Sequence, residues 1–510
     1  MEYHQVTYIE GTAYRENNLY PPSFVSWHTG AGLHNGNHVL FLTLRASPAQ
    51  YRPTTQELQY VTNINVQVRY TPGCTPLTTA DSYDLLIITS EGLSQELEPL
   101  VEHKQSMGID TQLVLLDDIY SGTYFSTEGR DDAEKVKYFI KNAVEQWGVT
   151  YVMLVGGRNG GLFEEKWWCP VRYTNLDDNS NWEEGYLSDL YFSDLYKYDG
   201  EEIVFADWDS NGNGVFAEWK MMGKDILDLY PDVYVGRLAC RNDFEASLMA
   251  FKIIAYETST AGQDWFTKFV GVAGDTYPSE NDPYYEGELA TQAAFENLSG
   301  FEFIPLWTSN GELTGPLDVI DTVNEGCGFL HFSGHGNPMG WSNHPPHDEE
   351  TWVDGLAVSD MRQLSNDGMY PVCIVGGCHN NQFNVSLLNL LKIYEGYDRW
   401  YSYIYKGEMS HESWGWVMTR KDGGGAIATI ANTALGYGEP GEYCLERRGR
   451  YMELMFFKSY GEGKTVLGET HGTDITYYLN KFPPMEDRID CKIAQQWALL
   501  GDPSLQIGGY

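Results

Sequence analysis

The distribution of apolar and polar residues divides the chain into a β-rich start and a long region in which strands alternate with helices. Residues 1–78 contain two segments of strand composition, 39–44 and 64–70, among scattered Pro and Gly residues. Short apolar runs typical of buried strands then occur at 84–89, 111–116, 151–155, 232–237 and 269–273. Segments of helical periodicity lie between them at 93–107, 131–147 and 244–258. This alternation predicts an α/β fold, with a parallel sheet covered by helices on both faces.

The strand and helix series is interrupted near 260–265, which indicates two sheet-forming halves. We therefore expect three regions: a β-rich region over 1–78, a first α/β subdomain over 79–262 and a second over 263–510. The last helix is expected from residue 493 to 500, leading into a final strand near Leu505.

Two apolar runs in the second half end in glycines and a reactive residue. Residues 328–332 stop at Ser333-Gly334-His335-Gly336, and residues 371–375 stop at Gly376-Gly377-Cys378. In an open α/β sheet, sites form beyond the carboxyl ends of the strands. His335 and Cys378 are 43 residues apart, which leaves room for one crossover between adjacent parallel strands. A thiol near an imidazole can become a nucleophile, and the amides of Gly336 and Cys378 could bind an oxyanion. The alternative is two core strands with an incidental cysteine and a capping histidine.

This pattern of apolar block, His-Gly, spacer, apolar block and Cys resembles the caspase-like cysteine peptidases, and more closely the gingipain family of secreted cysteine endopeptidases. The resemblance runs from about Tyr83 to the C-terminus. The blocks that carry it are 151–157, 232–237, 274–276, 333–336, 424–430 and 501–505. It implies a caspase/gingipain-like α/β/α sandwich of two subdomains, preceded by a propeptide-like region. The segment Gly376-Gly377-Cys378-His379 is richer in glycine than the family pattern.

The resemblance also implies roles for further residues. Asp275 would orient His335 as the third member of a triad, although it could equally cap the next turn. Asp282 would lie at the base of the pocket for the residue before the cleaved bond, which predicts a preference for Arg over Lys. Gly376 and Tyr437 would form the walls of that pocket, or Tyr437 could be ordinary packing. Alternatively, Asp282 is the N-cap of a helix that starts near Tyr284.

An acidic loop in the first half has the spacing of a calcium site. Counted from Asp207, oxygen-bearing side chains occupy positions 1, 3 and 5 (Asp207, Asp209 and Asn211), a glycine follows at 6 and Glu218 stands at 12. Asn213, at position 7, offers a backbone carbonyl. We expect a structural Ca²⁺ here that stiffens a long insertion, and the alternative is a surface turn rich in Asp and Asn.

Composition narrows the possible partners. The chain has 510 residues and a formal net charge of −39, which argues against nucleic acid or an anionic membrane as a main partner. No run of 18 apolar residues suggests a membrane span. Eight cysteines occur without a CxxC pair, and Cys327 and Cys373 are expected to be inert core thiols. The first residues do not resemble a signal peptide, so a secreted protein would have lost its signal before this numbering begins.

The sequence thus predicts a secreted cysteine endopeptidase with a Cys378–His335 dyad, acting on proteins or peptides outside the cell or at its surface. Two alternatives stay open: a sortase-like transpeptidase that uses the same thioester, and a catalytically silent caspase-like binding module. The polar connection 71–80, which holds two prolines, is expected to be accessible to proteases, so the chain is a candidate zymogen.

Overall fold

The computed structural model describes residues 12–70, 82–161, 165–176, 183, 185–220 and 223–510. The chain divides into two compact units, one of residues 1–30 and 40–76 and the other of residues 31–39 and 77–510. The connection 71–80, expected to be open to proteases, lies outside the described residues.

The smaller unit is built mainly from β-hairpins. Its elements are α1 (Thr12–Arg15), much of the hairpin of β1 (Val25–His34) and β2 (Asn37–Ala46), and the hairpin of β3 (Ala49–Arg52) and β4 (Glu57–Tyr60). The strand expected at 39–44 lies within β2. The strand expected at 64–70 is wrong, because these residues have no strand partner and Val66 and Val68 are about half exposed, at 49% and 48%. Alternation gives a strand only where a neighbouring strand can pair with it.

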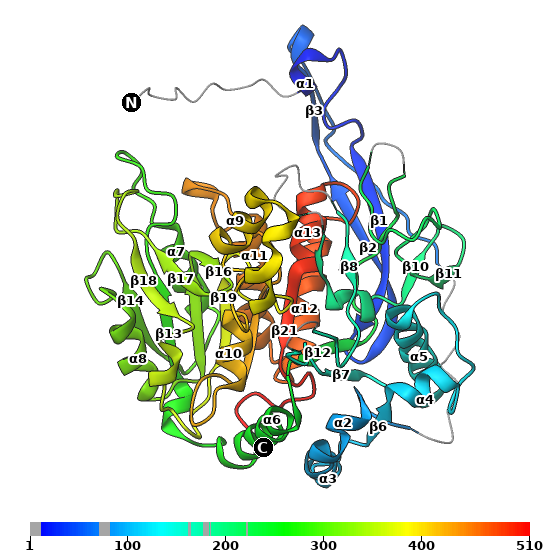
Figure 1. The fold of residues 1–510 in the computed structure, drawn as a ribbon. Coiled ribbons are helices and arrows are strands. Elements are labelled where there is room, and N and C mark those ends of the chain that lie inside the picture. Colours follow the sequence, from blue (N-terminus) through cyan, green and yellow to red (C-terminus); the bar gives the residue numbers. More distant parts are fainter. Residues whose placement is uncertain (1–11, 71–81, 162–164, 177–182, 184, 221–222) are drawn as a thin grey trace. The chain divides into compact units, whose positions relative to one another are not determined.

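The larger unit is organised around one ten-stranded sheet (Figure 1). In spatial order its strands are β14 (Glu302–Trp307), β13 (Lys268–Ala273), β15 (Phe329–Ser333), β19 (Val372–Gly376), β20 (Ala428–Asn432), β21 (Trp497–Leu500), β12 (Tyr234–Leu238), β7 (Tyr151–Val155), β5 (Leu85–Thr89) and β6 (Thr111–Leu115). Every neighbouring pair is parallel except β20 and β21. The two predicted strand series therefore form two parallel sets of opposite direction, and the C-terminal β21 joins the first set.

One predicted element near the C-terminus changes type. The helix expected over 493–500 ends earlier, because α13 spans Arg488–Gln496 and Trp497–Leu500 form β21. Four apolar residues are too few for their periodicity to separate a buried strand from the end of a helix.

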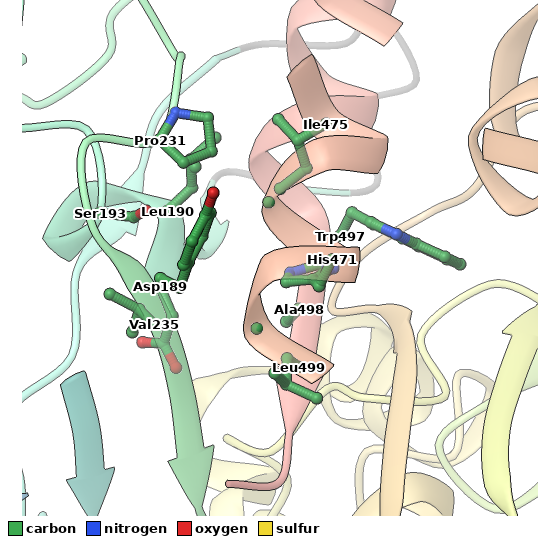
Figure 2. A pocket seen from close by; sticks show the side chains of 13 residues that line it. Asp189, Leu190, Ser193, Pro231, Val235, His471, Ile475, Trp497, Ala498 and Leu499 are labelled. Carbon is green, nitrogen blue, oxygen red and sulfur yellow. The ribbon is translucent and has the colours of Figure 1, made fainter. Parts of the chain in front are cut away.

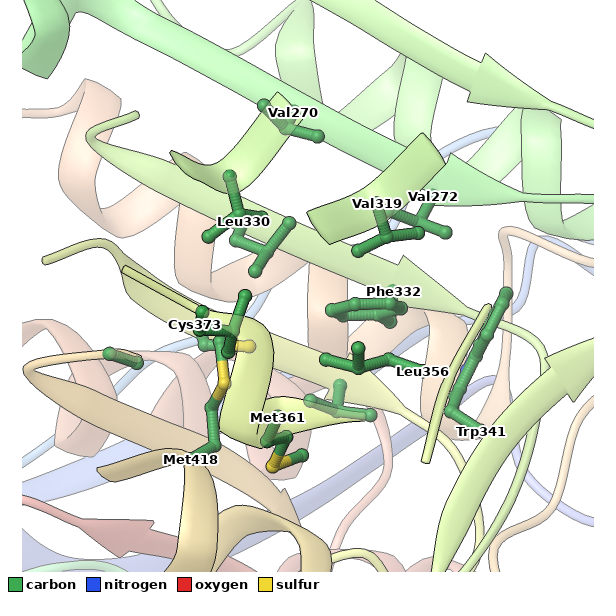
Figure 3. Close-up of a cluster of buried hydrophobic side chains, with 14 of the residues drawn as sticks. Val270, Val272, Val319, Leu330, Phe332, Trp341, Leu356, Met361, Cys373 and Met418 are labelled. Carbon is green, nitrogen blue, oxygen red and sulfur yellow. The ribbon is translucent and has the colours of Figure 1, made fainter. Parts of the chain in front are cut away.

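Alternate residues of the second strand set pack on opposite faces of the sheet. Val270, Val272, Leu330 and Phe332 join a buried cluster with residues of α8 (Pro316–Asn324) and α10 (Trp414–Arg420), shown in Figure 3. Phe269 and Phe329 instead contact the ring of Phe457 on α11 (Arg448–Gly461), and Phe269 also contacts Phe295 on α7 (Glu286–Phe295). The α/β fold with helices on both faces is confirmed in this half. The other long helices are α3 (Glu98–Ser106), α5 (Asp132–Trp147), α6 (Asp243–Ser259), α9 (Tyr397–Tyr405) and α12 (Leu467–Lys481). No helix in the described part of the chain combines the length and apolarity needed to cross a membrane.

Candidate active site

The ends of β15 and β19 bring His335 and Cys378 to the same edge of the sheet. These strands are parallel neighbours, and Ser333 pairs with Gly376 at their carboxyl ends. His335 and Cys378 each lie two residues beyond that pair. The two loops approach closely, because a Cβ added to Gly336 would lie 2.9 Å from the carbonyl oxygen of Cys378. A side chain at 336 would therefore push the loops apart.

His335 begins β16 (His335–Asn337), which forms a three-stranded antiparallel sheet with β17 (Gly340–Asn343) and β18 (Val353–Ala357). Its Nε2 lies 2.8 Å from the carbonyl oxygen of Thr276. Because a carbonyl only accepts, Nε2 carries the proton and Nδ1 is the basic nitrogen of the neutral ring. Burial lowers the pKa of His335, which favours this neutral form.

Cys378 is partly buried in the loop that follows β19. Its Sγ lies 3.8 Å from the carbonyl oxygen of Gly436, in the loop after β20. Burial raises the pKa of the Cys378 thiol, so the thiol is protonated at rest and needs a base to become a nucleophile. Among the residues that the structure describes, no acceptor is found for the amide of Cys378, which leaves this donor available to an oxyanion.

Asp275 does not hold the imidazole of His335. One of its carboxylate oxygens accepts the amide of His347 at 2.9 Å, and its own amide donates to the carbonyl of His344 at 3.0 Å. The orienting contact predicted for Asp275 is made instead by the carbonyl of the next residue, Thr276. A strand-end motif places this backbone near His335, but it does not determine whether the side chain or the carbonyl faces the ring.

Asn380 connects the two loops, and the sequence reasoning missed it. Its side-chain amide donates to the carbonyls of Asn337 at 3.1 Å and Gly340 at 3.2 Å, on either side of the turn that follows His335. A Cβ at Gly336 or Gly377 would collide with this side chain. The available signal was the pair of asparagines directly after Cys378-His379.

Of the three residues expected to form the substrate pocket, Tyr437 lies in the loop that follows β20, Asp282 contacts that loop and Gly376 ends β19. Asp282 accepts the amide of Tyr284 at 3.0 Å, and α7 begins only at Glu286, with Tyr285 as its N-cap residue. The alternative of Asp282 as a helix N-cap is therefore wrong. Its other carboxylate oxygen lies 3.4 Å from the position of a Cβ on Gly441, so Asp282 does reach the loop that follows Tyr437.

The other two pocket residues have unexpected neighbours. The Cα of Gly376 faces the carboxylate of Glu453, which a Cβ at this position would overlap. The ring of Tyr437 lies 5.3 Å from the Nζ of Lys492. Glycine at 376 is thus explained by a buried carboxylate on α11, whether or not substrate also passes over it.

A second charged cluster lies beside the nucleophile. Glu183, from the insertion of the first half, contacts Lys492 and lies 3.3 Å from the Nε2 of His379. It also accepts the amide of Leu435 at 2.8 Å. His379, the residue after Cys378, has a left-handed backbone with φ of 58°. Such strain in a non-glycine residue is common at functional sites.

Two hollows in the larger unit include neither His335 nor Cys378 in their walls. One is a cavity of about 20 Å³, roughly the space of one water molecule, between β12, β21 and α12; Asp189, His471 and Trp497 help to line it (Figure 2). The other, of about 580 Å³, lies beside the N-terminus of α5, with Asp131, Trp168 and Arg172 in its wall. The candidate active site is therefore at the loops after β15 and β19 and not in either hollow.

The predicted calcium ligands are tied to protein donors. Asp209 contacts Arg130 and accepts the amides of Asn213 and Gly214 at 3.0 and 2.9 Å. The carboxylate of Asp207 lies 3.2 Å from Lys197. Glu218 contacts Lys220 and accepts the Asn213 side-chain amide at 2.8 Å, while Asn211 accepts the amide of Asn213 at 3.0 Å. Within the described ranges, no group of three or more His, Cys, Asp or Glu side chains is arranged to hold a metal ion. One hydrogen-bond network links Asp209, Asn211, Asn213 and Glu218. A bound cation would have to displace the side chains of Arg130 and Lys220 from the carboxylates of Asp209 and Glu218.

Comparison with known proteins identifies the fold first. The chain is similar to the crystal structure of the Arg-specific cysteine proteinase gingipain R, with a TM-score of 0.56 and 18% identity, covering 85% of this chain and 80% of that one. A complex of the pro- and mature domains of this proteinase from Porphyromonas gingivalis gives a TM-score of 0.55 and 17% identity, covering 83% of this chain and 79% of that one. The caspase/gingipain-like fold inferred from the sequence is confirmed.

The sequence matches the model of peptidase family C25 over residues 78–508, and the chain belongs to this family. Curated relatives include gingipain R1 of Porphyromonas gingivalis, 20% identical over 419 residues that cover 75% of this chain and 35% of the relative. Gingipain R2 of the same organism is 20% identical over 417 residues, covering 74% of this chain and 47% of the relative. The chain thus spans less than half the length of these relatives.

Proposed function

We propose that this chain is a cysteine endopeptidase in which Cys378 and His335 form the catalytic dyad. The observation that carries the proposal is the pairing of Ser333 with Gly376, which brings the loops of the two residues side by side at one edge of the sheet. Membership of peptidase family C25 supports cysteine peptidase chemistry independently of this geometry.

In the proposed reaction, Nδ1 of His335 takes the proton of the Cys378 thiol, and the sulfur attacks the carbonyl carbon of the peptide bond. The amides of Gly336 and Cys378 donate to the oxyanion that forms. The C–N bond then breaks, the imidazolium gives its proton to the leaving amine, and the acyl group stays on Cys378 as a thioester. Water, deprotonated by His335, attacks the thioester and releases a carboxylic acid and the thiol.

The dyad is tested by substitution and by labelling. Cys378→Ala should abolish cleavage of a peptide library and labelling by an acyloxymethyl ketone probe, and His335→Ala should remove most of the rate. Cys327→Ala, which changes a buried thiol of the core, is the matched control and should keep both signals. Normal cleavage by either dyad variant contradicts the assignment.

The same experiment separates the two alternatives. A transpeptidase would be labelled on Cys378 and would transfer the acyl group to an added amine, which mass spectrometry detects as an amide product. A silent binding module would be neither labelled nor active. We favour hydrolysis because the thioester mechanism needs only water to complete it.

Five further properties belong to this proposal. Asp282 supports the predicted preference for Arg over Lys before the cleaved bond, whereas the buried Arg450 on α11 would favour an acidic residue at that position. Proteins or peptides are the proposed substrates, and the proposed compartment is the cell exterior or surface. Ca²⁺ in the 207–218 loop is proposed as a structural ion, and residues 1–78 are proposed to restrain the enzyme until they are cleaved.

A further inference from the structure

A buried arginine lies close to the candidate dyad. Arg450, near the start of α11, is only 4% exposed. Its guanidinium lies 5.3 Å from the ring centroid of Tyr277, and that ring stands edge-on to the imidazole of His335 at 6.0 Å. Tyr277 thus separates Arg450 from the proposed base by a single aromatic ring.

The loop behind the nucleophile packs directly on this arginine. A Cβ on Gly438 would lie 2.5 Å from Nη1 of Arg450 and 2.7 Å from the hydroxyl oxygen of Tyr277. Gly436, two residues earlier, has its carbonyl oxygen 3.8 Å from the Sγ of Cys378. Arg450 therefore contacts both the ring beside His335 and the loop beside Cys378. Because Gly438 has no side chain, the guanidinium of Arg450 can occupy the space next to it.

The guanidinium is poorly matched by its neighbours. Arginine has five N–H donors, yet the backbone acceptor of Arg450 is the Glu439 carbonyl, 3.4 Å from Nη1, and Nε is buried without an acceptor. In the described part of the chain, Arg450 forms no ion pair with a carboxylate, and its hydrogen bond to another side chain goes to the hydroxyl of Tyr277. A buried charge without a counter-ion is costly, so such a group is expected to have a partner that is not part of this chain.

The acidic side chains nearby are already engaged. Glu286 accepts the amide of Tyr277 at 3.1 Å and that of Gly441 at 2.8 Å, and it is fully buried. Asp282 accepts the amide of Tyr284. These carboxylates have donors from the backbone, whereas the guanidinium of Arg450 lacks a carboxylate.

We propose that Arg450 determines substrate specificity by binding the carboxylate of an Asp or Glu side chain that precedes the cleaved bond. The inference rests on the proposed peptidase function of the same site. A planar guanidinium and a carboxylate form a bidentate, charge-assisted pair. A substrate with Asn or Gln at this position would bind more weakly, because it would leave the buried guanidinium charge unpaired. This preference is opposite to the one that Asp282 predicts.

The test compares the full chain with two Arg450 variants on peptides that differ only at the residue before the cleaved bond: Asp, Glu, Asn, Gln, Arg or Lys. We expect kcat/KM to be about 30-fold or more higher for Asp or Glu than for Asn or Gln, the change produced by removing one partner of a buried ion pair. Arg450→Met should lose this preference, and Arg450→Glu should shift it toward Arg and Lys. Arg447→Met, which changes a more exposed arginine paired with Asp490, should leave it unchanged.

A second readout does not need turnover. The rate at which Cys378 is labelled by peptidyl acyloxymethyl ketones should be higher for an Asp probe than for an Arg probe, and Arg450→Met should equalise the two. A wild-type preference for Arg, lost in Asp282→Ala, overturns the inference and returns specificity to Asp282. An Arg450→Met variant that slows all peptides equally and moves the acid limb of the pH profile also overturns it, because Arg450 would then act on His335 through Tyr277. Absence of any Cys378 labelling instead rejects the proposed function itself.

Discussion

Gly376→Ala should destabilise the protein far more than a typical glycine substitution in a strand. The added methyl group would overlap the carboxylate of Glu453, which has to retreat by about 1 Å to restore a normal contact. An exposed glutamate would swing away at little cost. Here the side chain of Glu453 is 4% exposed and its Oε2 is held 3.0 Å from the Nε2 of His331, which is fully buried.

The expected cost has two parts. Overpacking a well-filled interior costs about 1–3 kcal/mol. Loosening a hydrogen bond to a charged group costs about 1.5–3 kcal/mol when the groups stay buried. When the carboxylate moves away, the overpacking is partly relieved but the hydrogen bond is loosened. The two costs therefore do not add fully, and we expect a loss of about 2–4 kcal/mol in unfolding free energy.

Urea unfolding followed by tryptophan fluorescence measures this cost as a shift of the midpoint. Gly340→Ala is the matched control, because its Cβ would meet neighbours only at 3.8 Å or more. Glu453→Ala in the Gly376→Ala background should cost less than Glu453→Ala alone, with a coupling of about 0.5–3 kcal/mol. If Gly376→Ala and Gly340→Ala unfold at the same urea concentration, the carboxylate does not occupy the space beside Gly376, and the account of this glycine is refuted.

Three other predictions concern the site and the acidic loop. Asn380→Ala should lower kcat several-fold without unfolding the protein, since it releases the turn after His335. Asn384→Ala, which changes a half-buried asparagine bonded to Tyr173, is its control in peptide assays. Asp275→Asn should leave the pH profile of cleavage unchanged because the carboxylate holds a backbone amide and not the imidazole; a shifted profile would restore the triad role. Removal of Ca²⁺ by a chelator should lower the melting temperature. The double variant Asp209→Ala, Glu218→Ala should have a melting temperature that the chelator does not change. If the metal-stripped wild-type protein melts at the same temperature as the untreated protein, the loop binds no structural Ca²⁺.

The fold was predictable where apolar runs were long enough or repeated in alternation. The strands at 85–89, 151–155 and 372–376 are buried along almost their whole length, so each appears in the sequence as an unbroken apolar run. Two failures have different causes. The run 64–70 has strand composition but no pairing partner. Trp497–Leu500 is a strand because Leu500 pairs with Thr429 of β20, 71 residues earlier, and with Arg237 of β12, 263 residues earlier. Pairing over such separations is not encoded in local pattern.

The site was predictable at its reactive residues and much less so around them. His335 and Cys378 are marked by their position at strand ends, His335 with a glycine on each side and Cys378 directly after two glycines. The groups that surround them come from distant segments: Thr276 supplies only a carbonyl, and Glu183 and Arg450 lie in an insertion and on a helix with no motif of their own. A backbone carbonyl has no sequence signature, and a charged residue on a helix is normally read as solvent-exposed.

Burial and charge together determine how the proposed dyad would be activated. Burial lowers the pKa of His335 and raises that of Cys378, so the resting pair is uncharged and proton transfer between them is unfavourable. The positive charge of Arg450 also lowers the pKa of His335, which opposes the imidazolium that the reaction must form. A substrate carboxylate bound to Arg450 would cancel much of this effect and raise the basicity of His335 at the moment of attack. Binding energy at Arg450 would then stabilise the transition state more than the bound substrate, so acidic peptides should differ from neutral ones mainly in kcat.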